Sequence, residues 1–207
     1  MEQNNPYAAP RVALVDEQVP QSLPGWTAGR LQLLGWLNLA YLVVTLVVLG
    51  LAFDPELVEL GDWLSAVSTL LGCYLALRLK AFLEARFAAR GLTWPVWLTV
   101  VLSLALEAVQ LYWGDAKLTE FSAPSFLYFG LLALLGVVIL WTGIVLLKVA
   151  NPYPSLRLLA WLNVASGVLV ASVILMLVGV LPLLAAMVVS ALVCFRGASE
   201  LKGREAA

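Results

Sequence analysis

Long apolar stretches dominate the pattern of hydrophobic and polar positions along this 207-residue chain. The hydrocarbon core of a bilayer is about 30 Å thick, so a helix that rises about 1.5 Å per residue needs roughly 20 apolar residues to cross it. Four stretches each fit one such helix, at residues 31–53, 63–79, 94–113 and 126–149. A fifth, at residues 158–195, carries no charge and is about twice as long as one span requires.

This fifth stretch is interpreted as two helices. Gly179 and Pro182 lie near its middle, and glycine and proline are typical of a tight helical hairpin. The pattern therefore predicts helices at 157–178 and 182–197. One span plus a re-entrant segment is the alternative, which the unbroken hydrophobicity of the final segment disfavours. The sequence thus predicts an all-α polytopic membrane protein with six transmembrane helices.

The distribution of lysine and arginine predicts the orientation of these helices. Six helices give three outer loops, at 54–62, 114–125 and 179–182, and only Lys117 is basic among their residues. The remaining basic residues lie on the opposite side, which the positive-inside rule assigns to the cytoplasm. The predicted organisation is a flexible cytoplasmic tail at 1–30, a transmembrane domain at 31–198 and a cytoplasmic C-terminal tail at 199–207.

Two segments of the chain are similar enough to indicate an internal repeat. Residues 31–40, LQLLGWLNLA, and 156–165, LRLLAWLNVA, are identical at seven of ten positions, and 96–99, VWLT, is a weaker echo. These segments open the first, third and fifth predicted helices, which predicts three repeated helical hairpins. Chance similarity between Leu- and Ala-rich helices is the alternative, above all for the middle copy.

Composition narrows the chemistry. Hydrophobic residues make up 62% of the chain and charged residues 12%, which is typical of membrane proteins. The chain has no histidine, which removes imidazole metal sites and histidine-based catalysis. Cys73 and Cys194 are expected to be small buried thiols. The basic residues form no patch, so nucleic acid is not expected as a partner. We expect no cofactor, no metal and no enzymatic activity.

Glu107 is the one charged side chain well inside a predicted helix. A carboxylate at the bilayer centre costs about 2.5–3.5 kcal/mol on insertion scales. Thr99, Ser103 and Gln110 share its helix face, so this polar stripe should face the bundle interior or a water-filled cleft. One interpretation is a proton- or cation-binding carboxylate at the base of an outward-facing vestibule. The other is a structural glutamate that is hydrogen-bonded to neighbouring helices.

Asn38 and Asn163 form a second polar pair. Because the repeat relates them, they are predicted to meet near a central axis and to fix packing by a hydrogen bond across the bundle, with a ligand site as the alternative. Small residues at helical spacing are expected to allow close packing; they include Ser65, Ser68, Thr69, Gly72, Gly130, Gly136, Gly143 and Gly167. The segment at 80–90, KAFLEARFAAR, is expected to lie on the inner headgroups or to dock a partner.

Three functional classes follow. The first is an accessory or interaction subunit of a membrane assembly, whose partners are membrane lipid and another membrane protein or a second copy. The alternative is a small transporter or channel that uses Glu107. A lipid-modifying enzyme is disfavoured because it needs convergent acid–base groups. The opening Asn-Pro-Tyr-Ala-Ala-Pro, at 5–10, is similar to the start of many bacterial multispanning proteins, so the bacterial inner membrane is the expected location.

Overall fold

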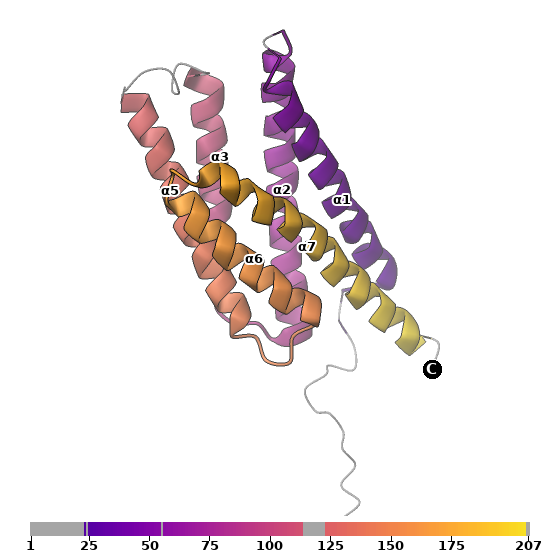
Figure 1. Cartoon of the computed structure of the whole chain (residues 1–207). Helices are drawn as coiled ribbons and strands as arrows, with labels where there is room; N and C mark the ends of the chain where they lie inside the picture. Colours follow the sequence, from indigo (N-terminus) through magenta and orange to yellow (C-terminus); the bar gives the residue numbers. More distant parts are fainter. Residues whose placement is uncertain (1–22, 24, 55, 114–122, 206–207) are drawn as a thin grey trace, which may run out of the picture.

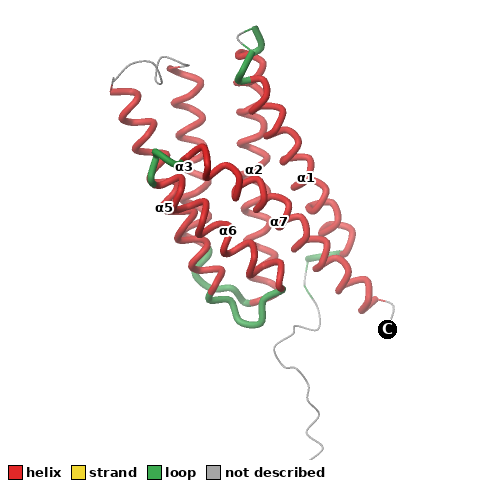
Figure 2. The backbone as a smooth tube through the Cα atoms, in the orientation of Figure 1, coloured by secondary structure: helices red, strands yellow, loops and turns green. Residues whose placement is uncertain are grey.

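A computed structural model describes residues 23, 25–54, 56–113 and 123–205, and the regular structure of these residues is α-helical (Figures 1 and 2). The helices are α1 (Ala28–Leu51), α2 (Val58–Phe87), α3 (Thr93–Trp113), α5 (Ala123–Leu147), α6 (Pro154–Ala171) and α7 (Met176–Glu205). All six are long and apolar enough to cross a bilayer. The prediction of an all-α membrane protein with six such helices is confirmed. Most of the predicted tail at 1–30, and Lys117 in the second outer loop, lie outside the described residues.

The helix ends follow local chemistry. The Thr27 hydroxyl accepts a hydrogen bond from the Arg30 amide at 3.3 Å and caps the start of α1. Pro154 is the first residue of α6, where a backbone N–H would have no partner within the helix, so the missing N–H of proline costs no hydrogen bond. Asn151, in the turn before α6, has a φ of 46°, a left-handed conformation that asparagine tolerates better than most residues. Beyond the last predicted helix, α7 continues to Glu205, so residues 199–205 extend it.

The predicted turn at 179–182 is wrong: the chain reverses at residues 172–175 (Figure 2). The Ser172 hydroxyl donates to the Leu169 carbonyl at 2.7 Å and accepts from the Leu175 amide at 3.2 Å, which satisfies backbone groups at the turn. Gly179 instead lies against α6, where a Cβ atom would come 3.0 Å from Val170 Cγ2. Pro182 lies inside α7. Gly179 therefore serves helix packing and Pro182 lies within a helix, and neither marks the reversal.

The six helices form a closed ring. Each helix packs against the next one along the chain, and α7 packs against α1. The closest approach joins α5 and α6, where a Cβ atom on Gly136 would lie 2.3 Å from the Ala171 nitrogen and one on Gly167 would lie 2.4 Å from the Leu140 nitrogen. The expected close packing through small residues is confirmed at these two positions. At Gly130, by contrast, no described atom lies within 4 Å of such a Cβ.

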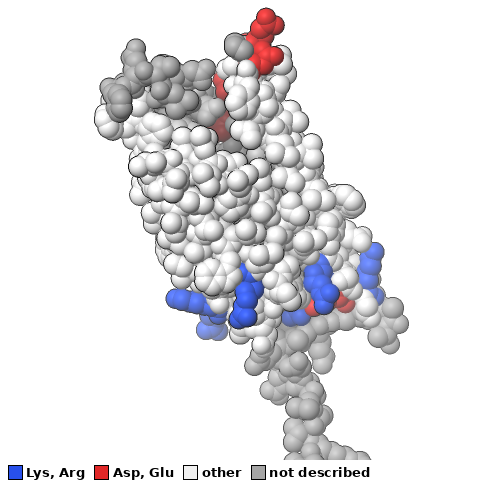
Figure 3. Space-filling view, in the orientation of Figure 1, with Lys and Arg blue, Asp and Glu red and all other residues white. Residues whose placement is uncertain are grey.

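The two ends of the ring differ in charge and in packing. Figure 3 shows lysine and arginine gathered at one end, here called the basic end, and most of the acidic residues at the other, the acidic end. All five buried residues of α1 lie between Ala28 and Asn38, in its half nearer the basic end. The α6–α7 turn also stops well short of the ends that α1, α2, α3 and α5 reach on the acidic side (Figure 1). The ring is therefore tightest at the basic end.

The segment at 80–90 belongs to this tight region. Phe82 is fully buried, and its ring meets the Trp26 ring edge-on with centroids 5.5 Å apart. Arg86 is 8% exposed, and its Nε donates to Glu200 Oε2 at 3.1 Å. Phe82 and Arg86 are thus held inside the protein, whereas Arg90 is exposed, and contact of this segment with lipid headgroups or a partner stays a prediction.

Candidate functional site

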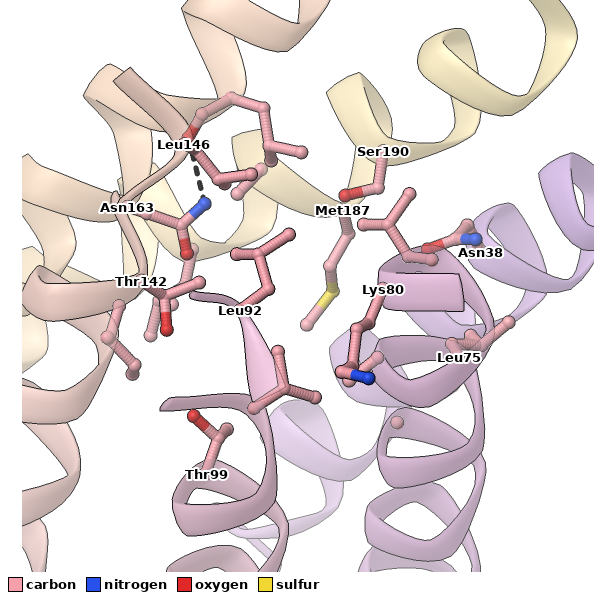
Figure 4. Close-up of a pocket in the computed structure, with 18 of the residues that line it drawn as sticks. Asn38, Leu75, Lys80, Leu92, Thr99, Thr142, Leu146, Asn163, Met187 and Ser190 are labelled. Atoms are coloured by element: carbon pink, nitrogen blue, oxygen red, sulfur yellow. Dashed lines mark hydrogen bonds between the residues drawn. The ribbon is translucent and has the colours of Figure 1, made fainter. Parts of the chain in front are cut away.

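A cavity of about 340 Å³ lies at the centre of the ring, and every helix contributes to its wall. Most of the wall is apolar, with Leu75, Leu92, Leu146 and Leu159 among its buried members. Each helix also adds at least one polar side chain; these are Asn38, Tyr41, Lys80, Thr99, Ser103, Thr142, Asn163 and Ser190. The cavity is thus an apolar chamber with polar groups spaced around it (Figure 4).

Asn38 and Asn163 have the same side-chain geometry on opposite parts of this wall. Each Nδ2 donates at 2.8 Å to the carbonyl four residues earlier in its own helix, that of Leu34 or Leu159. In Figure 4 the two amide oxygens are turned toward the cavity. The predicted hydrogen bond between the two asparagines is therefore not formed, because each amide is held by its own helix. Both asparagines line the central cavity, but they do not meet.

Thr99 and Thr142 are held in the same way. Their hydroxyls donate at 2.9 Å to the carbonyls of Pro95 and Val138, again four residues earlier. Thr99 is the residue that the weaker middle echo of the repeat aligns with the two asparagines. The three aligned positions therefore share both a back-bond and the same cavity.

A second, smaller cavity of about 140 Å³ adjoins the first between α1, α2 and α3. The two share Tyr41, Thr99 and Ser103 as wall residues. Thr69 and Cys73 also line the smaller one. Cys73 is thus half-buried at a cavity wall, whereas Cys194 is buried in the core. Through the smaller cavity, the polar lining extends from the central cavity to Thr69.

Glu107 lies where α3 meets α2. Its Oε2 accepts hydrogen bonds from Thr69 Oγ1 at 2.8 Å and from Ser65 Oγ at 3.2 Å. Its Oε1 is buried and has no hydrogen-bond partner among the described residues. The sequence predicted a packing role for Ser65 and Thr69. Their spacing of four residues puts both hydroxyls on one face of an apolar helix, where they can donate to a single acceptor inside the membrane. Glu107 does not line either cavity directly but is joined to the smaller one through Thr69.

The polar contacts between α2 and α3 continue toward the acidic end. Gln110 Nε2 donates to Asp62 Oδ1 at 3.2 Å, about one helical turn beyond Glu107. The predicted stripe on α3 is therefore divided in function. Thr99 and Ser103 face the cavities, whereas Glu107 and Gln110 bond to α2.

Ionic contacts close the basic end. Glu84 accepts a hydrogen bond from Lys80 Nζ at 2.9 Å, and Glu200 accepts from both Arg86 and the Tyr153 hydroxyl. The pKa of Tyr153 is raised, first by burial and then by the Glu200 carboxylate beside it. These contacts tie α2 to the start of α6 and to the end of α7. Nothing in the sequence pattern pointed to this cluster, because its members come from three distant segments.

Within the described residues, no three acidic or cysteine side chains come together as a metal-binding group. The chemistry of the site therefore rests on one carboxylate, two carboxamides and several hydroxyls. Compared with known proteins, the chain matches no family model, no curated protein and no solved structure.

Proposed function

We propose that this integral membrane protein is a small transporter whose central cavity binds a solute and whose Glu107 binds the proton or cation that is exchanged for it. The observation that carries the proposal is the cavity, to which all six helices contribute a polar side chain. Its volume of about 340 Å³ falls within the range of about 300–1,000 Å³ that is usual for small-molecule sites.

Glu107 is suited to coupling because its two oxygens have different surroundings. Oε2 holds the hydroxyls of Ser65 and Thr69, while the partnerless Oε1 is the position for a proton or cation. Hydrogen bonds to an ionised acceptor are roughly twice as strong as those between neutral groups. Protonation at Oε1 would therefore weaken the contact between α2 and α3 and change how the helices enclose the cavity.

The proposed orientation places the basic end in the cytoplasm, as the positive-inside rule requires. Glu107 then lies between the cavity and the outer surface, and the ionic contacts of Glu84 and Glu200 lie at the cytoplasmic closure. We propose a bacterial inner membrane as the location. Transport needs no bond-making chemistry, in keeping with the expectation that the protein is not an enzyme.

The accessory-subunit function stays a prediction. A subunit that only holds a partner needs close-packed helices and gains nothing from a polar-lined cavity among all of them. The cavity therefore favours transport. Mass spectrometry of the protein gently extracted from its native membrane compares the two functions. A stoichiometric membrane partner would support the accessory function, and recovery of the chain alone or as a homo-oligomer would favour transport.

Liposomes that contain the purified protein and a luminal pH dye test the transport mechanism. Quaternary ammonium ions, amino acids, carboxylates and sugars are added singly, because each crosses lipid slowly by itself. We expect one class to drive proton movement through the wild type, and Glu107→Gln to abolish that movement while the protein keeps its helical circular-dichroism spectrum. Protein-free liposomes are the control. Undiminished proton movement in Glu107→Gln would show that the mechanism is wrong, and proton movement in no class would show that the proton is not the exchanged ion.

A further inference from the structure

The central cavity offers hydrogen-bond acceptors in fixed positions, and its one cation is already paired. From this we infer that the cavity selects an organic cation, an ammonium group on an apolar body, over neutral and anionic solutes. The inference rests on the proposed role of the cavity as a solute site and names the class of solute that it takes.

The two asparagines establish the polarity of the site. Their Nδ2 groups are committed to the carbonyls of Leu34 and Leu159 at 2.8 Å. The opposite amide orientation would set Oδ1 against a carbonyl oxygen, so the hydrogen bonds decide which atom faces the cavity. Each asparagine thereby offers an amide oxygen as an acceptor in the cavity wall, while the second hydrogen of its Nδ2 can still be donated (Figure 4).

The two threonines add acceptors of the same kind. A hydroxyl has one hydrogen, and Thr99 and Thr142 donate theirs to backbone carbonyls of their own helices at 2.9 Å. What remains on each oxygen is lone pairs. Ser103, Ser190 and Tyr41 also line the cavity, and their hydroxyls can serve as donor or acceptor. The side chains of Thr99 and Thr142 are therefore acceptors only, and together with the amide oxygens of Asn38 and Asn163 they supply acceptors from α1, α3, α5 and α6.

Lys80 is the cationic side chain in the described wall, and an anion would need it. Its Nζ forms an ion pair with Glu84 Oε2 at 2.9 Å, so its charge is compensated. A bound carboxylate would be repelled by the lone pairs of Thr99 and Thr142, which have no hydrogen left to donate, and a charge that lacks hydrogen-bond partners in an apolar chamber is costly. An ammonium group instead donates to the acceptors, and its apolar body lies against the leucines of the wall. The ring of Tyr41 can add cation–π attraction.

Cation selection also fits the place of Glu107. When a monovalent cation leaves the cavity and a proton binds Glu107, the total charge of the site does not change. The carboxylate therefore need not remain charged inside the membrane while the cavity is empty. The shared wall residues Tyr41, Thr99 and Ser103 connect the cation position with the smaller cavity, and Thr69 connects that cavity with the carboxylate.

Three probes with one carbon skeleton test the selection: 4-phenylbutylamine, 4-phenylbutan-1-ol and 4-phenylbutyrate. At pH 7 they carry a positive charge, no charge and a negative charge. Binding to the purified wild type in nanodiscs is measured by equilibrium dialysis, with protein-free nanodiscs to subtract partition into lipid. We expect the amine to bind at least about tenfold more tightly than the alcohol, and the carboxylate to show no saturable binding.

The chain supplies a matched set of variants. Thr99→Val and Thr142→Val each remove one acceptor at constant shape, and each should weaken amine binding about tenfold, as for a hydrogen bond to a charged group. Thr45→Val is the control, because Thr45 makes the same back-bond, to Tyr41 at 2.8 Å, and does not line the cavity. Its affinity for the amine should equal that of the wild type.

The outcomes separate this inference from the proposed function. If the alcohol or the carboxylate binds as tightly as the amine, cation selection is wrong and the cavity remains a solute site. Binding of the amine that Thr99→Val, Thr142→Val and Thr45→Val all leave unchanged also overturns the inference, because the probe then binds elsewhere. If no probe binds, both cation selection and the solute cavity are overturned. Selective amine binding without proton movement in liposomes upholds the inference and refutes transport.

Discussion

Substitution of Gly136 by alanine should destabilise the protein through a single close contact between α5 and α6. A Cβ atom at this position would lie 2.3 Å from the Ala171 nitrogen and 2.7 Å from the Ala171 Cα. Both are backbone atoms, so no side-chain rotation can relieve the clash. Because the optimal separation of carbon atoms is about 3.5–4.0 Å, the two helices must move apart by about 1 Å.

The magnitude follows from two opposing effects. Overpacking of a close contact costs about 1–3 kcal/mol, whereas alanine favours a helix over glycine by about 1 kcal/mol. The expected net effect of Gly136→Ala is a loss of about 0–2 kcal/mol of stability. Gly130→Ala, in the same helix, gains the helix propensity without a clash, since no described atom lies within 4 Å of its Cβ position. It should be neutral or slightly stabilising.

Reversible unfolding by SDS in mixed micelles, followed by circular dichroism, measures this difference. Gly167→Ala provides a second test from the facing helix, because its Cβ would come 2.4 Å from the Leu140 nitrogen. We expect Gly136→Ala and Gly167→Ala to unfold at lower SDS fractions than Gly130→Ala. Equal stability of Gly136→Ala and Gly130→Ala would falsify the close α5–α6 approach.

Three further predictions concern polar contacts. Ser172→Ala leaves the Leu175 amide without its acceptor and should cost about 0.5–1.5 kcal/mol in SDS unfolding, because this turn is exposed. Glu200→Gln leaves the buried Arg86 without a charged partner and should also cost about 1–3 kcal/mol in SDS unfolding. This cost is smaller than that of breaking a fully buried ion pair, because Glu200 is partly exposed. Above about pH 10 the unfolded chain ionises its tyrosines, while the raised pKa keeps Tyr153 neutral in the folded protein. Stability should therefore fall as the pH rises through 10, and Tyr153→Phe should reduce the slope in unfolding experiments between pH 8 and 11.

Each of these predictions has a control. Ser199→Ala removes a similar bond, from its hydroxyl to the Arg196 carbonyl at 2.8 Å, without freeing a backbone amide, so it should be nearly neutral. Arg86→Met with Glu200→Gln removes both charges and should recover part of the loss seen in Glu200→Gln alone. For the pH series, Tyr112→Phe replaces an exposed tyrosine and is the control. A result in which Tyr112→Phe and Tyr153→Phe behave alike would contradict the raised pKa of Tyr153.

Hydropathy predicted the number and class of the helices because the bilayer thickness requires a long apolar stretch in each of them. The same signal could not locate the α6–α7 turn, since Ser172 is a single hydroxyl within an unbroken apolar run. Gly179 and Pro182 gave a stronger local pattern, but glycine also serves close helix packing and proline is tolerated inside membrane helices. The three-hairpin repeat stays a prediction.

Helical spacing and the aligned segments together predicted that Thr99, Ser103 and the two asparagines face the interior. Spacing could not predict what Glu107 contacts, because that depends on the register of α2 against α3. Hydroxyl residues such as Ser65 and Thr69 suit both close packing and hydrogen bonding, so their role was assigned only once the facing helix was known. The partners of Arg86 and Tyr153 depend on tertiary contacts that leave no periodic trace in the sequence.

The two ends of the ring suggest which one moves first in the proposed transport cycle. At the basic end, a buried apolar core is reinforced by the contacts of Glu200 with Arg86 and Tyr153. Toward the acidic end, α1 has no buried residue beyond Asn38 among those described, and α2 is joined to α3 through side-chain bonds to Glu107 and from Gln110. A change of charge on Glu107 therefore acts where the fewest apolar contacts oppose movement. We expect binding of a proton to shift the outer halves of α1 and α2 while the basic end stays closed.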